Sequence, residues 1–184
     1  MLGRLKANAF PILLVCICTT ALYLELRHKK VPAPPPPPPI TSFEECAKKY
    51  PVMTSYPPQC ATPDGKHFTQ DIGNELEVQD LITIEVPRPQ SEVVSPLVIS
   101  GKAKGSWFFE ASFPVELQSA TGTTIARGQA KASGNWMTED FVSYTLNLDF
   151  SPQPKGALGK LILKKDNPSG DPAHDNALIV PVVF

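Results

Sequence analysis

From Leu81 to the C-terminus the sequence alternates between apolar and polar residues, and this pattern limits the fold more than any other feature of the chain. Only an extended strand places every second side chain on the same face. The alternation is clearest between residues 109 and 117, where the apolar positions are Phe109, Ala111, Phe113, Val115 and Leu117. This segment is therefore predicted to be a half-buried β-strand and not a helix.

Similar runs recur through the last 104 residues and are separated by glycine, proline, asparagine and aspartate, which are typical of turns. The predicted strands are residues 81–86, 96–103, 108–118, 124–132, 141–150, 160–165 and 177–184. About seven short strands of this kind predict an all-β fold for residues 81–184, an antiparallel immunoglobulin-like β-sandwich, with a small closed barrel as the alternative. Proline cannot donate to a sheet ladder, so Pro114 and Pro181 are expected on edge strands or facing outward. The expected core residues are Trp107, Phe109, Phe113, Trp136, Tyr144 and Phe150.

The N-terminal 30 residues differ from the rest in charge and hydropathy. They carry five basic residues and one acidic residue, whereas the whole chain has a formal net charge of −1, which gives no reason to expect a nucleic-acid partner. Residues 7–24 contain no charge, and as a helix they would measure about 27 Å, close to the roughly 30 Å of a bilayer core. Residues 1–30 are therefore predicted to be a membrane anchor with one transmembrane helix. A cleaved signal peptide and a lipoprotein modified at Cys16 or Cys18 are the alternatives.

Two short segments follow the anchor. Residues 31–40 contain seven prolines and are predicted to form a stiff polyproline spacer, or alternatively a docking motif for a proline-binding domain. Residues 41–70 are predicted to be a small module, in which Ser42 and Glu45 form a capping box that starts a helix running through Lys49. A polar linker is expected at residues 71–80.

Cys46 and Cys60 are the only cysteines outside the predicted membrane segment. In an oxidising compartment a disulfide between them would contribute about 3 kcal/mol by restricting the unfolded chain, and we predict this bridge. Two reduced thiols, or half of a metal site with His67 as a third ligand, are the competing interpretations. His67 is otherwise expected to be a solvent-exposed turn residue.

Few residues suggest catalysis. The segment 165–176 supplies Asp166, Asp171 and Asp175 as oxygen ligands and His174 as a base, but it does not follow the order of an EF-hand calcium loop and is predicted to be an ordinary turn. Glu139 and Asp140 are expected on a loop surface. Since no nucleophile, phosphate-binding or zinc-protease motif occurs, we predict no enzyme activity, no catalytic residue, no cofactor and no metal.

Three runs resemble a known family. The runs are SPLVISGKAKGSWFFEASFPVEL at 95–117, NWMTEDF at 135–141 and LILKKDNPSG at 161–170. They resemble the immunoglobulin-like domain of bacterial spore germination proteins of the Gmad type. The resemblance covers approximately residues 82–184. It implies a β-sandwich displayed outside the cytoplasmic membrane that acts in binding or assembly, and it supplies no catalytic residue.

These features together predict a single-pass membrane protein with its N-terminus in the cytoplasm and residues 31–184 outside. A disulfide needs an oxidising compartment, a rigid spacer suits an exposed domain, and the family is extracytoplasmic. The predicted function is a noncatalytic binding or assembly module of the bacterial cell envelope that recognises an envelope protein or wall component. Recognition is expected from the clusters Trp107-Phe108-Phe109 and Trp136-Met137. The alternative is a wall-acting enzyme or enzyme inhibitor with its site in the cysteine module or at residues 166–175.

Overall fold

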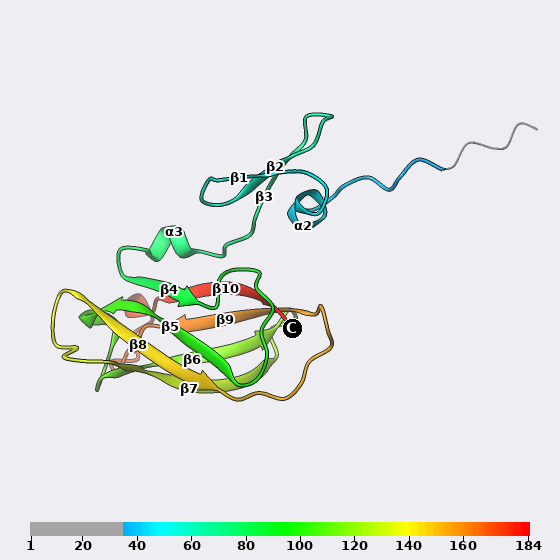
Figure 1. The fold of residues 1–184 in the computed structure, drawn as a ribbon. Coiled ribbons are helices and arrows are strands. Elements are labelled where there is room, and N and C mark those ends of the chain that lie inside the picture. Colours follow the sequence, from blue (N-terminus) through cyan, green and yellow to red (C-terminus); the bar gives the residue numbers. More distant parts are fainter. Residues whose placement is uncertain (1–34) are drawn as a thin grey trace, which may run out of the picture. The chain divides into compact units, whose positions relative to one another are not determined.

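The computed structural model describes residues 35–184. The predicted membrane helix and the start of the predicted spacer lie outside these residues. Residues 35–40 contain no helix or strand, and the five prolines at 35–39 are exposed. Within residues 35–184, no helix has both the length and the apolar character needed to cross a bilayer. Thr41–Phe184 form one compact unit (Figure 1).

The cysteine module begins with a capped helix. Ser42 accepts a hydrogen bond through Oγ from the Glu45 backbone N–H at 3.2 Å, and the Glu45 carboxylate accepts one from the Thr41 backbone N–H at 2.8 Å. A small sheet in the order β1-β2-β3 follows the helix. The elements of the module are α2 Phe43–Ala47, β1 Val52–Met53, β2 Gln59–Ala61 and β3 His67–Thr69. The helix thus ends two residues earlier than the predicted Lys49.

The predicted disulfide is present and fastens α2 to β2. It joins Cys46 and Cys60, whose Cα atoms are 6.0 Å apart, and both cysteines are fully buried. A segment this short buries little apolar surface of its own, so the crosslink supplies stability that a core supplies in a larger domain.

Seven antiparallel strands follow the module and confirm the predicted all-β class. They form one continuous sheet in the order β10-β9-β6-β7-β8-β5-β4. The bounds are β4 Ile82–Val86, β5 Leu97–Lys104, β6 Ser112–Ser119, β7 Thr124–Ala132, β8 Phe141–Leu148, β9 Leu158–Lys164 and β10 Ala177–Val183. Each strand overlaps one of the seven predicted from the alternation.

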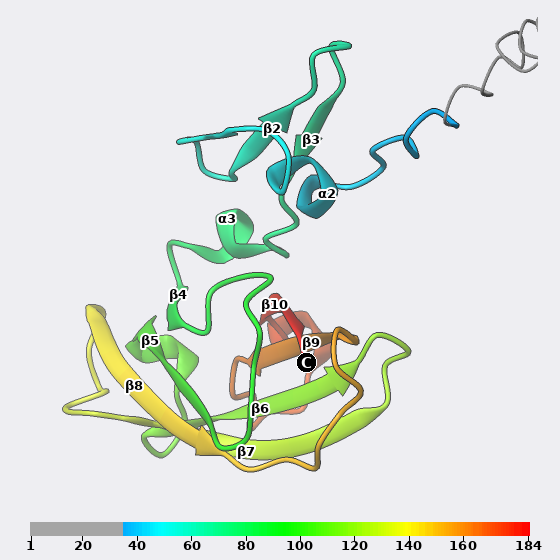
Figure 2. The ribbon, with the colours of Figure 1, turned by 45° about the vertical axis from the view of Figure 1, so that its right-hand side comes forward.

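The two layers of the domain are the two ends of this one curled sheet (Figure 2). β7 and β8 pair only through Lys131 with Thr145 and Ala132 with Tyr144, and this narrow junction is where the sheet bends. In contrast, β5 and β8 pair over their full length. Since β4 and β10 are the two ends of the described sheet and do not pair with each other, the sheet does not close into a barrel.

The outer edge of β10 is occupied by a segment that the sequence did not predict to pair. Residues 90–93 run beside β10, and Glu92 forms a parallel bridge with Val183. The Val93 backbone N–H donates to the Val183 carbonyl at 2.8 Å, and the Val183 N–H donates to the Ser91 carbonyl at 3.1 Å. This end of the sheet edge is therefore not open to another strand.

Asn74 occupies the other end of the same edge. Its side-chain Nδ2 donates to the Ala177 carbonyl at 2.9 Å, and its Oδ1 accepts from the Ile179 N–H at 2.7 Å. Gly73 makes this approach possible, because a Cβ at its position would collide with the Ile179 carbonyl and its φ is +67°. The expected polar linker at 71–80 thus contacts the domain, and it contains the short helix α3 Glu75–Val78 and buries Ile72, Glu75 and Val78.

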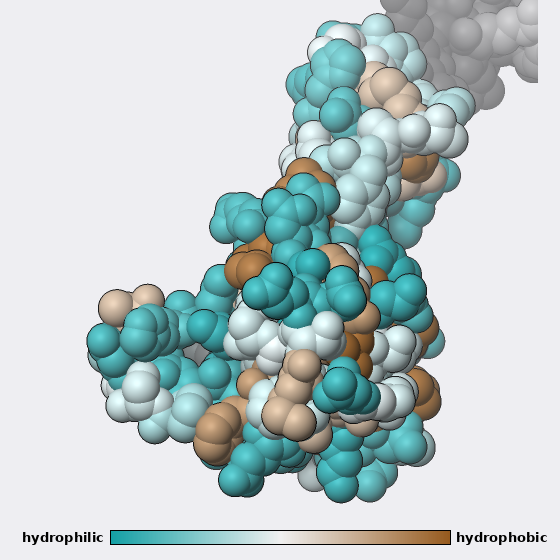
Figure 3. Space-filling view, turned by 90° about the vertical axis from the view of Figure 1, so that its left-hand side faces the viewer, coloured by the Kyte–Doolittle hydropathy of each residue, from teal (hydrophilic) through white to brown (hydrophobic). Residues whose placement is uncertain are grey.

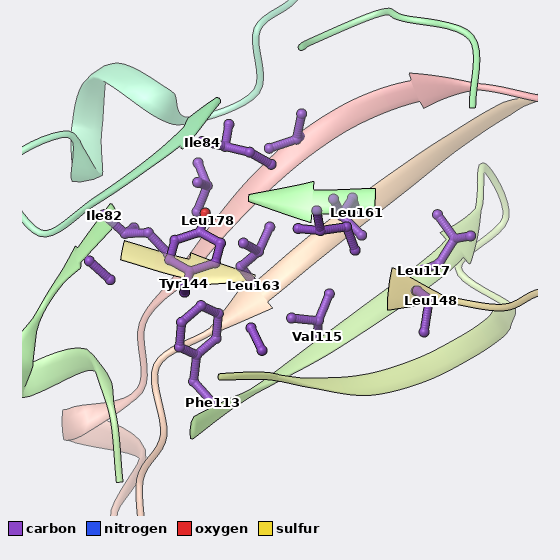
Figure 4. Packing of buried hydrophobic residues seen from close by; sticks show 14 of the residues in the cluster. Ile82, Ile84, Phe113, Val115, Leu117, Tyr144, Leu148, Leu161, Leu163 and Leu178 are labelled. Atoms are coloured by element: carbon purple, nitrogen blue, oxygen red, sulfur yellow. The ribbon is translucent and has the colours of Figure 1, made fainter. Parts of the chain in front are cut away.

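The core lies between the two layers. Every strand contributes buried residues from its inward face, but β7 contributes only one fully buried residue, Ala130. Figure 4 shows side chains from β4, β6, β8, β9 and β10 converging on one interior. Phe113 packs edge-on against Tyr144, with ring centres 4.9 Å apart. Trp107, Phe113 and Tyr144 are buried as predicted, while Trp136 and Phe150 are partly buried at the margin.

The prediction for Phe109 is wrong, since its side chain is 42% exposed. Glu110 and Ala111 have positive φ angles and turn the chain, so β6 begins only at Ser112. The alternation before Ser112 therefore belongs to a loop. The prolines fit their expected places, with Pro181 on the edge strand β10 and Pro114 on the outward face of β6.

Candidate functional site

Three loops leave the sheet at the same end, which we call the loop end. They are residues 105–111 between β5 and β6, 133–140 between β7 and β8, and 165–176 between β9 and β10. In immunoglobulin-like domains, loops gathered at one end of the sandwich form variable binding surfaces on a rigid scaffold. Figure 3 faces this end, whose surface is mainly hydrophilic with separate apolar patches.

The three loops are fixed to one another. The Asp166 backbone N–H donates to the Trp107 carbonyl at 3.0 Å, which joins the third loop to the first. Gly105 joins the first loop to the second, because a Cβ on it would collide with the carbonyl oxygens of Trp136 and Thr138. The first two loops are also anchored to the core, through the buried Trp107 and the partly buried Trp136.

The two aromatic clusters predicted to recognise a partner divide between core and surface. Trp107 and Phe108 are buried, so they support the loop end and do not contact solvent. Phe109 is 42% exposed and Met137 is 74% exposed, while Trp136 packs against the margin of the core. Only Phe109 and Met137 of the predicted clusters present substantial apolar surface.

The 165–176 loop is closed by its own side chains. Asn167 donates through Nδ2 to the Asp171 carbonyl and to Asp175 Oδ1, both at 2.8 Å. Asp171 Oδ1 accepts from the Ala173 N–H at 3.0 Å, at the start of a short 3₁₀ turn. The acidic side chains at 171 and 175 thus act as acceptors within the loop, in the manner of turn residues.

Ser169 and His174 are the nearest approach to a nucleophile and base in this loop. Ser169 Oγ lies 3.4 Å from His174 Nδ1, beyond the distance of an activated pair, and it lies 2.6 Å from Asn167 Oδ1, to which it donates. The hydroxyl proton is therefore directed at an amide oxygen. Within residues 35–184, no group of three or more histidine, cysteine or acidic side chains is placed to hold a metal.

The remaining sequence candidates are surface residues. His67 lies on β3 and is exposed, and Glu139 and Asp140 are exposed on the second loop. The disulfide occupies both cysteine sulfurs, so they are not free thiolates that could ligate zinc.

A polar cluster that the sequence did not reveal lies beside α3 and β4. Glu75 is 9% exposed, and its Oε2 accepts hydrogen bonds from the Tyr56 hydroxyl and from Arg88 Nη2, the latter at 3.4 Å. Burial raises the pKa of the Glu75 carboxyl, and the nearby Arg88 guanidinium opposes this shift in pKa. Arg88 also donates through Nη1 to the Ile84 carbonyl at 2.7 Å.

Glu116 forms the centre of a second carboxylate cluster, on the outward face of β6. Its Oε1 lies 2.9 Å from Lys164 Nζ and 3.2 Å from Arg127 Nε, and its Oε2 accepts from Gln118 Nε2 at 3.0 Å. The hydrogen bond from Lys164 is the main reason that the pKa of Glu116 lies below its ordinary value.

No curated protein matches the chain, and no solved structure matches it. A family model does match, over the strands β4 to β9 and the loops between them. Residues 81–170 match the family described as Gmad2, the immunoglobulin-like domain of bacterial spore germination, which confirms for this part of the chain the resemblance found in the sequence.

Proposed function

We propose that this chain is a membrane-anchored, extracytoplasmic and noncatalytic module of the bacterial cell envelope, and that its loop end contacts an envelope protein or wall component. The observation that carries the proposal is the exposure of Phe109 and Met137 on loops that are fixed to the core. Exposed apolar side chains on a rigid scaffold favour recognition, because binding them orders few additional groups. The match of residues 81–170 to an immunoglobulin-like domain family supports a binding module.

The proposed topology rests on residues 7–24 and on the disulfide. An uncharged stretch of this length suits one membrane crossing, and the Cys46–Cys60 bridge suits an oxidising compartment. The exposed proline segment before the module supports the role of a spacer.

Labelling with a membrane-impermeant maleimide tests the topology in intact cells. Val94→Cys places a thiol at a side chain that is 70% exposed, and Gly3→Cys places one before the predicted membrane segment. We expect Val94→Cys to react in intact cells and Gly3→Cys to react only after lysis. Protection of the thiol at position 94 until lysis would overturn the topology.

Cross-linking of the full-length chain in its envelope tests the contact surface. We expect a cross-linked band that is lost in the double variant Phe109→Ser and Met137→Ser. The matched control is Val94→Ser, which also removes an exposed apolar side chain but lies outside the loop end. A band that survives the double variant, or that the control removes as well, would show that the loop end is not the contact surface.

A further inference from the structure

A pocket of about 180 Å³ lies between α3 and β4, away from the loop end. Glu75, Leu76 and Gln79 line it from α3 and the residue after it, and Ile82 and Thr83 line it from β4. Arg88 lines it as well. The pocket thus combines an apolar wall with a carboxylate, an amide and a guanidinium.

One oxygen of the Glu75 carboxylate lacks a hydrogen-bond partner. Oε2 accepts hydrogen bonds from the Tyr56 hydroxyl and the Arg88 guanidinium. Oε1 is buried and has no hydrogen-bond donor within residues 35–184. A buried carboxylate oxygen without a donor is unfavourable, because the protein has removed its water without replacing the hydrogen bond. This side of the carboxylate is one donor short.

Glu116 shows how this chain satisfies a carboxylate of similar exposure. The side chain of Glu116 is 13% exposed and that of Glu75 is 11% exposed. Glu116 has two cationic partners and one amide partner, distributed over both oxygens. Glu75 has one cation and one hydroxyl, both on the same oxygen. The difference between the two sites is a second cationic donor.

We propose that the pocket beside Glu75 binds a primary ammonium group carried on a short aliphatic stem. An ammonium group has three donors and no acceptor, so it can supply the donor that Glu75 Oε1 lacks once the buried carboxylate turns toward the pocket that Glu75 lines. The aliphatic stem fits the apolar wall formed by Leu76 and Ile82. A guanidinium suits the site less well, because its paired donors match a carboxylate with both oxygens free, and Oε2 is occupied.

The charge near the pocket favours a cation. Glu75 and Glu85 both lie close enough to Tyr144 to help raise its pKa, whose main cause is burial. Among the described residues, Glu75 has a single ion-pair partner, Arg88. An incoming ammonium would give Glu75 a second cationic partner, and Glu116 already has two in Lys164 and Arg127. The pocket lies outside the loop end, so binding there is independent of the proposed contact surface.

The first experiment uses three probes on the full-length chain in a neutral detergent. The probes are n-butylammonium, n-butanol and tetramethylammonium, and the readout is the ¹H–¹⁵N resonances of Gln79 and Thr83. We expect saturable shifts with n-butylammonium and binding at least about tenfold weaker for the other two, since a charged hydrogen bond is lost in each. Equal binding of n-butanol, equal binding of tetramethylammonium, or no saturable shift would each overturn the proposal.

Variants provide the second experiment. Glu75→Gln keeps the shape of the side chain but removes its charge, and we expect n-butylammonium to bind it at least about tenfold more weakly. The matched control Glu116→Gln should bind as the parent does. Unchanged binding by folded Glu75→Gln, or an equal loss in Glu116→Gln, contradicts the proposal. If Glu75→Gln does not fold, the selectivity of the parent among the three probes still decides the question.

Discussion

The two edge strands of the seven-stranded sheet, β10 and β4, differ in the groups that bond to their outer backbone. The β10 edge is closed by Asn74 and by residues 90–93, which bond to its backbone. At the β4 edge, the guanidinium of Arg88 caps the Ile84 carbonyl, and the pocket beside Glu75 lies next to it. Protein groups that bond to an edge strand stabilise the sheet and prevent its association with other strands. An edge beside polar groups that lack partners leaves room for a ligand.

The largest expected effect follows from removing the closed edge. Deleting residues 177–184 takes away β10, which pairs with β9 over seven residues and supplies Leu178, Val180 and Val182 to the core. We expect loss of the cooperative thermal transition measured by circular dichroism. The matched control deletes the exposed residues 35–39 and should leave the transition unchanged. A cooperative transition that persists without β10 would contradict the role assigned to this edge.

Much of this fold was predictable because each strand carries its own alternation. The buried residues of β5, β6 and β8 alternate in sequence, so the pattern predicts both the strands and their inward faces. The closure of the β10 edge was not predictable, because residues 90–93 have no alternation and pair with residues about ninety positions away. Phe109 was misplaced because an alternating pattern does not reveal the turn at Glu110 and Ala111.

The next effect concerns Asn74, which bonds to β10 through its side chain. Asn74→Ala leaves the Ala177 carbonyl and the Ile179 N–H without these partners in a partly buried place. We expect the free energy of unfolding in urea to fall by about 2 kcal/mol. Asn167→Ala is the control, since Asn167 also makes two side-chain hydrogen bonds, but at positions where water can replace them. Equal losses in the two variants would show that the β10 edge does not depend on Asn74.

A smaller effect is expected at the β4 edge. Arg88→Gln removes the donor to the Ile84 carbonyl and the cation beside Glu75. We expect the free energy of unfolding to fall by about 1 kcal/mol, because a buried carboxylate loses its only cationic partner among the described residues. The comparison is Arg127→Gln, after which Glu116 keeps Lys164 and Gln118, so the change should stay within about 0.5 kcal/mol. If Arg127→Gln loses more free energy of unfolding than Arg88→Gln, Glu116 depends on its arginine more than Glu75 does, and the prediction is wrong.

The pocket beside Glu75 could not have been found from sequence patterns. Tyr56, Glu75 and Arg88 belong to three segments with no shared periodicity, and Glu75 stands in a polar stretch where glutamate is normally exposed. Only the fold brings them together. The disulfide could be predicted from the sequence because Cys46 and Cys60 are the only two cysteines outside the predicted membrane segment, and this choice needed no three-dimensional information.

The smallest effects are two slopes of stability against pH, and they should have opposite signs. Burial raises the pKa of Glu75, so the folded state holds this proton more tightly than the unfolded state. Its contribution to stability is complete below the unfolded pKa of about 4.3 and is lost as the pH rises through the raised folded pKa. The pKa of Glu116 is lowered, mainly by Lys164, so its contribution is present above the unfolded value and is lost as the pH falls through the lowered folded pKa.

Urea unfolding from about pH 3 to pH 7 measures both slopes in matched variants. The free energy of unfolding of Glu75→Gln minus that of the parent should rise with pH. The parent loses the stability that its protonated Glu75 carboxyl contributes as the pH rises, whereas the variant has no such contribution to lose. The same difference for Glu116→Gln should fall with pH, because only the parent gains the ion pairs of the charged carboxylate. If both differences change in the same direction, the two carboxylates do not differ in the way their partners imply, and the vacant donor position at Glu75 loses its physical basis.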